Sequence, residues 1–393
     1  MAASTGQMAV YTAVAAGAGV VVEFLLAHSL GIRAYGNMGT LLALAAQLSV
    51  GQTTLQLAVA RQVARTGSLL AGWWRLARTA ALTLVAAGLT AGWLLEGVWH
   101  LPPATLPFVF LVSVAWFYLG ILRGIAQGLE SYRLYGTSLM VENLVRLAVT
   151  AALIFPLGVW GGLVGLGAGA AAASAWAAWA VPRPRPARGS PSWDALAWTL
   201  LGVAVTALTP RLDLLVVKRD WDPWSAGAWA ALSLFGQGFA QLPWLAGTVM
   251  FPRIVRDPGR RSLYFLFGAG VSLGVLLLAA GVGWYLLPRF AAIFFANRYR
   301  PWQWVFGPYL FAIIPVALYG LWVSYAVADD RRDLLVLLAG GIVAYMLALA
   351  VHHTTMPDIL WDYLVLAAVE LVVLIDTLAS GPWRRWEAAP GRT

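Results

Sequence analysis

Residues 104–126 read ATLPFVFLVSVAWFYLGILRGIA, an apolar stretch in which Arg123 is the only charged residue. A helix crosses the hydrocarbon core of a bilayer with about 20 apolar residues, so this stretch is long enough to span a membrane. Similar stretches fill most of the chain on both sides of it and predict about twelve transmembrane helices in total. The others lie near residues 8–30, 38–60, 76–98, 134–156, 159–180, 195–217, 227–250, 263–287, 303–327, 333–352 and 358–379.

The composition of the whole chain agrees with an all-α polytopic membrane protein. Hydrophobic residues occupy 61% of the 393 positions, charged residues only 11%, and the mean hydropathy is +0.75. A soluble domain has no interior large enough to bury this share of apolar side chains. The chain contains no cysteine, which excludes disulfides and thiolate metal sites.

The formal net charge is +9, and all but one of the 26 basic residues are arginine. A basic chain can indicate nucleic-acid binding, but these arginines concentrate in short loops between the apolar stretches. When the N-terminus is placed inside, most arginines fall in cytoplasmic loops, as the positive-inside rule requires. The sequence therefore predicts a multi-pass protein of the cell membrane with both termini cytoplasmic, and no nucleic-acid partner.

One break in composition divides the chain near its midpoint. Residues 181–192 read VPRPRPARGSPS, where proline repeatedly interrupts helix and favours extended backbone. We expect a cytoplasmic linker here. The predicted organisation is an N-terminal six-helix bundle (1–180), the linker (181–192), a C-terminal six-helix bundle (193–380) and a cytoplasmic tail (381–393).

The two halves are predicted to be repeats of the same orientation. Residues 107–133 align without gaps over residues 307–333, and this alignment matches Gly120 with Gly320. Parallel repeats of this kind are related by an axis along the membrane normal.

Three further stretches carry a resemblance to a known family. They read LAHSLGIRAYGNMGTLLALAAQLSVGQTTLQLAVARQVA (26–64), ILRGIAQGLESYRLYGTSLMVENLVRLAVT (121–150) and RLDLLVVKRDWDPWSAGAWAAL (211–232). In this order and spacing they resemble polysaccharide-export flippases of the multidrug/oligosaccharidyl-lipid/polysaccharide superfamily. The opening turn of that family is matched by Leu30, Gly31, Tyr35, Gly36 and, further on, Arg61. Trp229 stands where the family usually has tyrosine.

The resemblance implies two bundles around a central cavity. It also implies alternating access that moves undecaprenyl-pyrophosphate-linked oligosaccharide from the inner to the outer leaflet for cell-surface polysaccharide synthesis. The implied partners are that lipid-linked oligosaccharide, membrane lipids, and a polysaccharide polymerase or glycosyltransferases. Two alternatives within the superfamily stay open: an ion-coupled exporter of drugs or organic cations, and a peptidoglycan lipid flippase. An intramembrane glycosyltransferase is disfavoured because the external loop near 288–302 contains no acidic residue.

Ionisable and amide groups inside apolar spans are candidates for the substrate site, since burying them in a membrane is costly. In the resembled family the first, second, seventh and eighth spans face the cavity. Arginine suits a pyrophosphate, amides suit sugar hydroxyls, and an acidic residue can carry a coupling ion. The candidate substrate-binding residues are Glu23, Gln47, Gln52, Gln56, Arg61, Arg211, Asp213, Gln237 and Gln241.

Structural roles compete with these assignments. Glu142 and Arg146 are spaced i, i+4, so their plain interpretation is an ion pair within one helix. Glu23 and Asp213 are candidates for ion coupling or for ion pairs, and the glutamines can equally hold helices together.

Motifs typical of enzymes or of ATP-driven transport lack the structural context that they need. Residues 270–274 match G-x-S-x-G, but they lie inside an apolar span without the strand, turn and helix that this motif needs. His352 and His353 are adjacent and point apart on a helix, which argues against a metal site. No Walker A motif surrounds Lys218, the only lysine. The sequence predicts a transporter that is not an enzyme and needs no cofactor or metal.

Overall fold

The computed structural model describes residues 2–379 except residues 31, 100, 209–212, 214, 215, 218–220, 222, 258 and 295–302. The chain forms two compact units, residues 1–200 and 201–393. The predicted tail at 381–393 lies outside the described residues.

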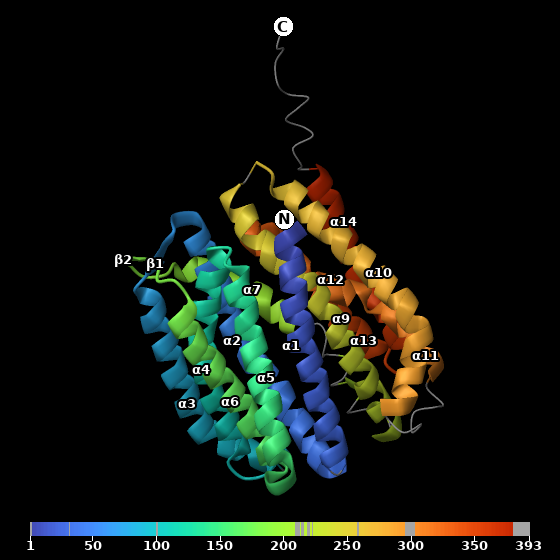
Figure 1. Ribbon diagram of the computed structural model, residues 1–393. Coiled ribbons are helices and arrows are strands. Elements are labelled where there is room, and N and C mark those ends of the chain that lie inside the picture. The colour runs from blue at the N-terminus through green and yellow to red at the C-terminus, as the bar shows by residue number, and fades with distance from the viewer. Residues whose placement is uncertain are drawn as a thin grey trace. The chain divides into compact units, whose positions relative to one another are not determined.

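Unit 1 is built from long helices that run side by side (Figure 1). They are α1 (Ala2–Ser29), α2 (Ile32–Thr66), α3 (Gly72–Trp99), α4 (Thr105–Gly128), α5 (Tyr132–Leu157) and α6 (Val159–Ala180). Helix α7 begins at the end of this unit and continues into the next.

Unit 2 contains the remaining helices. They are α7 (Trp193–Leu208), α9 (Pro223–Arg256), α10 (Arg261–Phe294), α11 (Gln303–Ala312), α12 (Ile314–Asp329), α13 (Arg332–Val351) and α14 (Met356–Ala379).

In the part of the chain that the structure describes, the apolar stretches of the sequence are helical over nearly all of their length. Within the described residues, eight helical segments are long and apolar enough to cross a membrane. They are in α1, α3, α4, α5, α6, α10, the consecutive pair α11 and α12, and α13. The prediction of an all-α polytopic membrane protein is confirmed.

One predicted span is interrupted. The stretch 303–327 forms two helices that meet at Ile313. Pro315 is the second residue of α12, and proline in a helix lacks an N–H and clashes with the carbonyl four residues earlier. The interruption therefore has a local cause that the hydropathy pattern does not contain.

Helix α4 is the packing centre of unit 1, where it contacts α2, α3 and α6. Its glycines allow α2 to approach very closely. A Cβ atom on Gly120 would lie 2.5 Å from the carbonyl oxygen of Gln52, and one on Gly124 would lie 2.6 Å from that of Gln56. Small residues serve this purpose in membrane helices, where close van der Waals packing replaces the hydrophobic effect.

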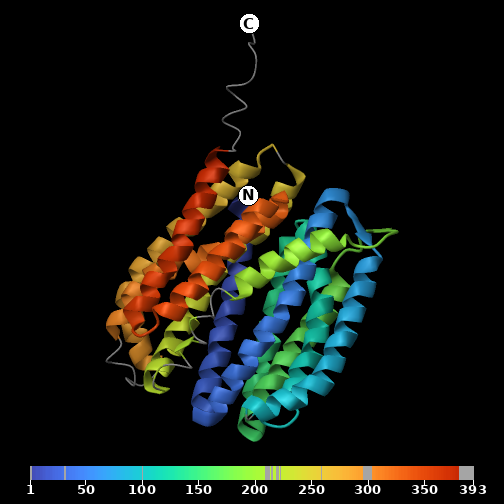
Figure 2. The same cartoon turned by 180° about the vertical axis from the view of Figure 1, so that it is seen from behind.

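The linker contains a short strand that the sequence did not predict. Strand β2 (Arg185–Ala187) pairs in parallel with β1 (Ser68–Leu70), which lies between α2 and α3 (Figure 2). The proline residues keep this segment extended, as expected, and the extended backbone then finds a partner in the α2–α3 loop. The linker is thereby attached to unit 1.

Helix α12 is the counterpart of α4 within unit 2, where it packs on α9, α10 and α14. Both helices end in the same turn. Glu130 follows α4 with φ of 56° and Asp330 follows α12 with φ of 61°. In each turn the next amide donates to the carbonyl five residues earlier, at 2.8 Å and 2.9 Å. This matched geometry supports the alignment of 107–133 over 307–333.

Candidate functional site

Asp213 is the buried acidic centre of unit 2. Its side chain is 2% exposed. Trp229 of α9 donates its indole N–H to Oδ2 of Asp213 at 2.9 Å, and Tyr363 of α14 donates its hydroxyl to the same atom at 2.7 Å. Buried carboxylates in membranes are held by such donors and are commonly functional.

Aromatic rings surround this carboxylate. Tyr309 of α11 meets Trp229 edge to face, with ring centroids 5.6 Å apart. Tyr345 of α13 stacks on Tyr363 at 5.7 Å. A negative charge among aromatic rings is an environment that attracts cations. We name Asp213, Trp229, Tyr309, Tyr345 and Tyr363 the acidic–aromatic cluster.

Unit 1 contains a buried ion pair between α4 and α5. A guanidinium nitrogen of Arg123 lies 2.6 Å from a carboxylate oxygen of Glu142, with side chains 5% and 16% exposed. Arg123 also donates to Ser138 at 2.9 Å, and Trp116 donates to the other Glu142 oxygen at 3.0 Å. These four side chains form one connected network.

Arg146 pairs with a different helix. Its guanidinium lies 3.5 Å from a carboxylate oxygen of Glu23 on α1. The expected ion pair between Glu142 and Arg146 within α5 is therefore wrong. Each of the two finds a partner on a neighbouring helix, because α1 and α4 both pack against α5 and bring opposite charges to it.

The glutamines of α2 face the interior of unit 1. Gln56 donates to Gln127 of α4 at 2.9 Å and to Tyr135 of α5 at 3.1 Å, so its amide joins three helices. Gln52 is buried beside Gly120, and Gln47 lines a small cavity of about 90 Å³. Gln56 thus holds helices together, whereas the roles of Gln47 and Gln52 in substrate binding stay predictions.

The other predicted site residues divide into two groups. Arg61 is buried on α2, and its role in substrate binding stays a prediction. Arg211 and Gly31 lie outside the described residues, and so do the side chains of Gln237 and Gln241.

Sequence reasoning did not find the partners of these groups. Trp229 was visible as a departure from the family pattern, and Arg123 as the one charge in its apolar stretch. Tyr363 and Tyr345 carry no local signal, because tyrosine is common near membrane interfaces.

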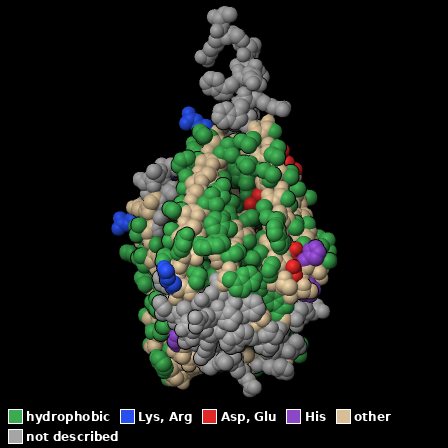
Figure 3. Space-filling model, turned by 90° about the vertical axis from the view of Figure 1, so that its right-hand side faces the viewer, with side chains coloured by type: hydrophobic (Ala, Val, Ile, Leu, Met, Phe, Trp, Pro, Cys, Tyr) green, Lys and Arg blue, Asp and Glu red, His purple; other side chains and the backbone are tan. Residues whose placement is uncertain are grey.

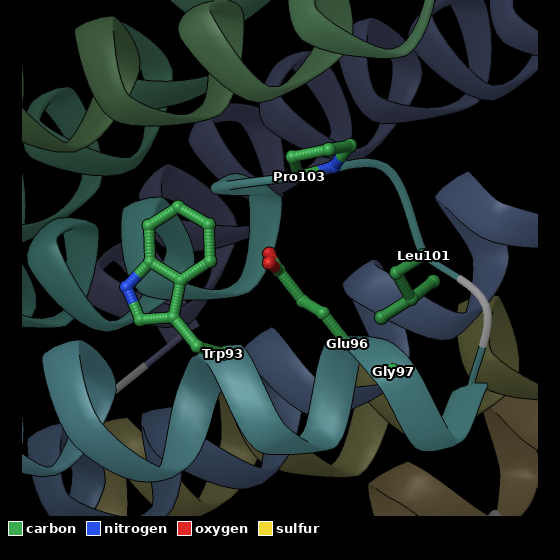
Figure 4. A pocket seen from close by; sticks show the side chains of 5 residues that line it. All are labelled: Trp93, Glu96, Gly97, Leu101 and Pro103. Atoms are coloured by element: carbon green, nitrogen blue, oxygen red, sulfur yellow. The ribbon is translucent and has the colours of Figure 1, made fainter.

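Glu96 was also not predicted. It lies beside a shallow pocket of about 420 Å³ that Trp93, Leu101 and Pro103 also line (Figure 4). Its carboxylate accepts hydrogen bonds from the backbone N–H of Ala104 at 3.0 Å and from that of Leu106 at 2.7 Å. These bonds cap the first turn of α4, so Glu96 has a structural role.

Arg331, in the turn between α12 and α13, joins this turn to α14. It contacts Asp333 at 2.5 Å and Asp376 at 2.8 Å. The hydrogen bond with Asp333, and then that with Asp376, raises the pKa of Arg331 above its already high usual value.

Comparisons with known proteins identify the fold. No family model matches the chain, and no curated protein matches it. Solved structures do match over nearly the whole chain. A MATE transporter in complex with MaD3S has a TM-score of 0.75 at 12% identity and covers 95% of both chains.

Two other structures agree. An outward-facing multidrug-resistance MATE transporter of the MOP superfamily has a TM-score of 0.69 at 13% identity, covering 99% of this chain and 96% of its own. A MATE transporter from Vibrio cholerae has a TM-score of 0.67 at 16% identity, covering 96% and 98%. The chain therefore has the fold of the MATE transporters.

Proposed function

We propose that this protein is a secondary transporter that exports organic cations across the cell membrane, by alternating access coupled to inward flow of protons or sodium ions. The observation that carries the proposal is the buried carboxylate of Asp213, held by Trp229 and Tyr363 among aromatic rings. The fold likeness to multidrug-resistance transporters supports it.

The chemistry of the acidic–aromatic cluster fits exchange of two cations. A carboxylate in a low-dielectric interior attracts positive charge strongly, and aromatic faces stabilise large organic cations. A proton or sodium ion that neutralises Asp213 removes the attraction for the cargo. Binding of the coupling ion and binding of the cargo then exclude each other, as antiport requires.

Fold alone does not decide the cargo. A MOP superfamily transporter from Pyrococcus furiosus shares the fold, with a TM-score of 0.67 at 13% identity, and its binding pocket is described as having reverse polarity that suggests a different function. The assignment for this chain therefore rests on its own residues.

Binding of tetraphenylphosphonium to the purified protein tests the proposal. We expect Asp213→Asn to weaken binding at least about tenfold, because the amide has a similar shape but no charge. Asp194→Asn is a matched control, since Asp194 also accepts from an indole, that of Trp198 at 3.2 Å, but is exposed on α7.

Equal affinity of the wild type and Asp213→Asn for the cation would remove Asp213 from the cargo site. Failure of the wild type to bind any lipophilic cation would count against the exporter itself.

A second candidate function is flipping of lipid-linked oligosaccharide, and one observation in unit 1 favours it. Arg146 is 16% exposed, and within the described residues its buried Nε has no hydrogen-bond partner. An arginine with donors to spare suits a pyrophosphate group. The contact of 3.5 Å to Glu23 is long enough for an anionic ligand to replace it.

A further inference from the structure

An exposed histidine sits next to a buried acid at one end of unit 2. His352 follows the last residue of α13, and its side chain is 68% exposed. Its Nδ1 lies 3.7 Å from Oδ1 of Asp362 on α14, a side chain that is only 5% exposed. Histidine and acidic side chains lie side by side at the edge of the face in Figure 3. One partner therefore meets solvent while the other faces the interior.

The carboxylate of Asp362 has one oxygen that can accept a proton. Its second oxygen, Oδ2, is buried and makes no hydrogen bond within the part of the chain that the structure describes. The hydroxyl of Tyr345 on α13 is also buried, and it interacts with Tyr363. Buried polar atoms in folded proteins are nearly always bonded, so Oδ2 of Asp362 calls for an explanation, and a proton in transit supplies one.

Asp362 is continuous with the acidic–aromatic cluster. The next residue, Tyr363, donates its hydroxyl to Asp213 at 2.7 Å, and Tyr345 stacks on the Tyr363 ring. Asp362 also acts electrostatically on Tyr345, so the polar groups from His352 to Asp213 lie near one another on α13 and α14.

A second connection holds the histidine turn to the same cluster. The indole N–H of Trp221 donates to the backbone carbonyl of His353 at 2.6 Å. Trp221 also meets Trp229 edge to face at 5.9 Å, and Trp229 donates to Asp213. The turn is therefore fixed relative to Asp213 and is not a free loop.

We propose that His352 and Asp362 form the outer entrance of a proton path that ends at Asp213. The inference rests on the proposed ion-coupled function and deepens it by assigning protons as the coupling ion. In the topology predicted from the arginines, the α13–α14 turn faces the outside, which is the side from which protons drive export.

The transfer is a simple relay. Nδ1 of neutral His352 takes a proton from an external hydronium ion, which leaves as water. The new Nδ1–H bond then breaks as an O–H bond forms on Asp362. The acid then gives its proton to the Tyr345 hydroxyl, which passes its own proton to the Tyr363 hydroxyl, and Tyr363 gives its proton to the carboxylate of Asp213, to which it donates at 2.7 Å. His352, Asp362 and the two tyrosines return to their starting states. Imidazole is suited to the first step because it gains and loses protons near neutral pH.

Other charged or titratable groups near this path have separate roles. Asp358 accepts from Thr354 and Thr355, both at 2.8 Å, and so fixes the start of α14. The remaining groups that face the path are His353 on the turn and Tyr309 on α11, beside Tyr345, Tyr363 and Asp213.

The test is the charge displaced when proteoliposomes on a solid-supported membrane receive an acid step from outside, without cargo. Variants His352→Gln and Asp362→Asn remove titration while keeping size. Controls are His28→Gln, another exposed histidine at a helix end, and Asp358→Asn. We expect both path variants to slow the displacement at least about tenfold, controls to match the wild type, and Asp213→Asn to abolish it.

The outcomes separate the two proposals. A displacement that depends on Asp213 but is unchanged in His352→Gln and Asp362→Asn would overturn the path and leave the exporter intact. No displacement in the wild type would overturn proton coupling and the path together. Slowing in Asp358→Asn equal to that in Asp362→Asn would also overturn the path, because it would trace the effect to the fold of the turn.

Discussion

Arg123 and Glu142 show how single charges stabilise unit 1. The pair lies between α4 and α5 with little solvent exposure, and Ser138 and Trp116 complete its hydrogen bonds. Removing one partner of a buried pair leaves an uncompensated charge, whereas removing both partners leaves none.

We therefore expect Arg123→Ala to lower the free energy of unfolding by about 3 to 5 kcal/mol, measured by denaturant unfolding in detergent. Adding Glu142→Ala should recover part of this loss. A double variant less stable than the sum of both single variants would contradict the assignment of an ion pair.

The sequence does not reveal which residues pair with these charged side chains. Spacing within α5 correctly marked Glu142 and Arg146 as charges that need partners. The partners come from α4 and α1, which approach α5 only through tertiary packing, so the local i, i+4 rule gave the wrong pairing. For the same reason Asp213 was a candidate from the sequence, but its donors on α9 and α14 were not.

Helix packing in unit 1 depends on positions where no side chain fits. A Cβ atom on Gly120 would lie 2.5 Å from a backbone oxygen of α2, and backbone atoms cannot move aside as a flexible side chain can. Gly274 in α10 has open space around the same position.

Gly120→Ala should destabilise the protein by about 1 to 3 kcal/mol through overpacking. Gly274→Ala should be neutral or stabilising by up to about 1 kcal/mol, because alanine favours helix. Thermal unfolding in detergent compares the two variants. Equal destabilisation by both would show that the approach of α2 to α4 is not the cause.

The helices were the part of this structure that the sequence predicted best. The described parts of the apolar stretches are helical apart from the break at Ile313, because a membrane requires every backbone group to be bonded within its own segment. The alignment that matched Gly120 with Gly320 also matched the turns after α4 and α12. The β1–β2 pairing escaped prediction, since it joins segments more than a hundred residues apart that have no strand pattern.

The whole chain combines a common fold with very low sequence identity. Hydrophobic patterning and helix packing suffice to specify the fold, so TM-scores near 0.7 accompany identities of 10 to 16%. Function depends on a few polar groups inside that frame, and these are the positions where the chain must be tested directly.

The orientation in the membrane is testable because the chain contains no cysteine. Ser190 in the linker and Thr354 in the α13–α14 turn are both exposed. We expect Ser190→Cys to react with a membrane-impermeant thiol reagent only after cells are opened, and Thr354→Cys to react in intact cells. The wild type is the blank, and the reverse labelling would place both termini outside.

Transport by the reconstituted protein tests the central claim most directly. Proteoliposomes loaded with tetraphenylphosphonium receive an acid or sodium-rich medium outside, and loss of the cation is followed with an ion-selective electrode. In parallel, flipping of fluorescent undecaprenyl-pyrophosphate-linked sugar is measured in the same vesicles. We predict gradient-dependent cation efflux that disappears in Asp213→Asn. Flipping of the lipid-linked sugar with no cation efflux would contradict the exporter and establish the flippase instead.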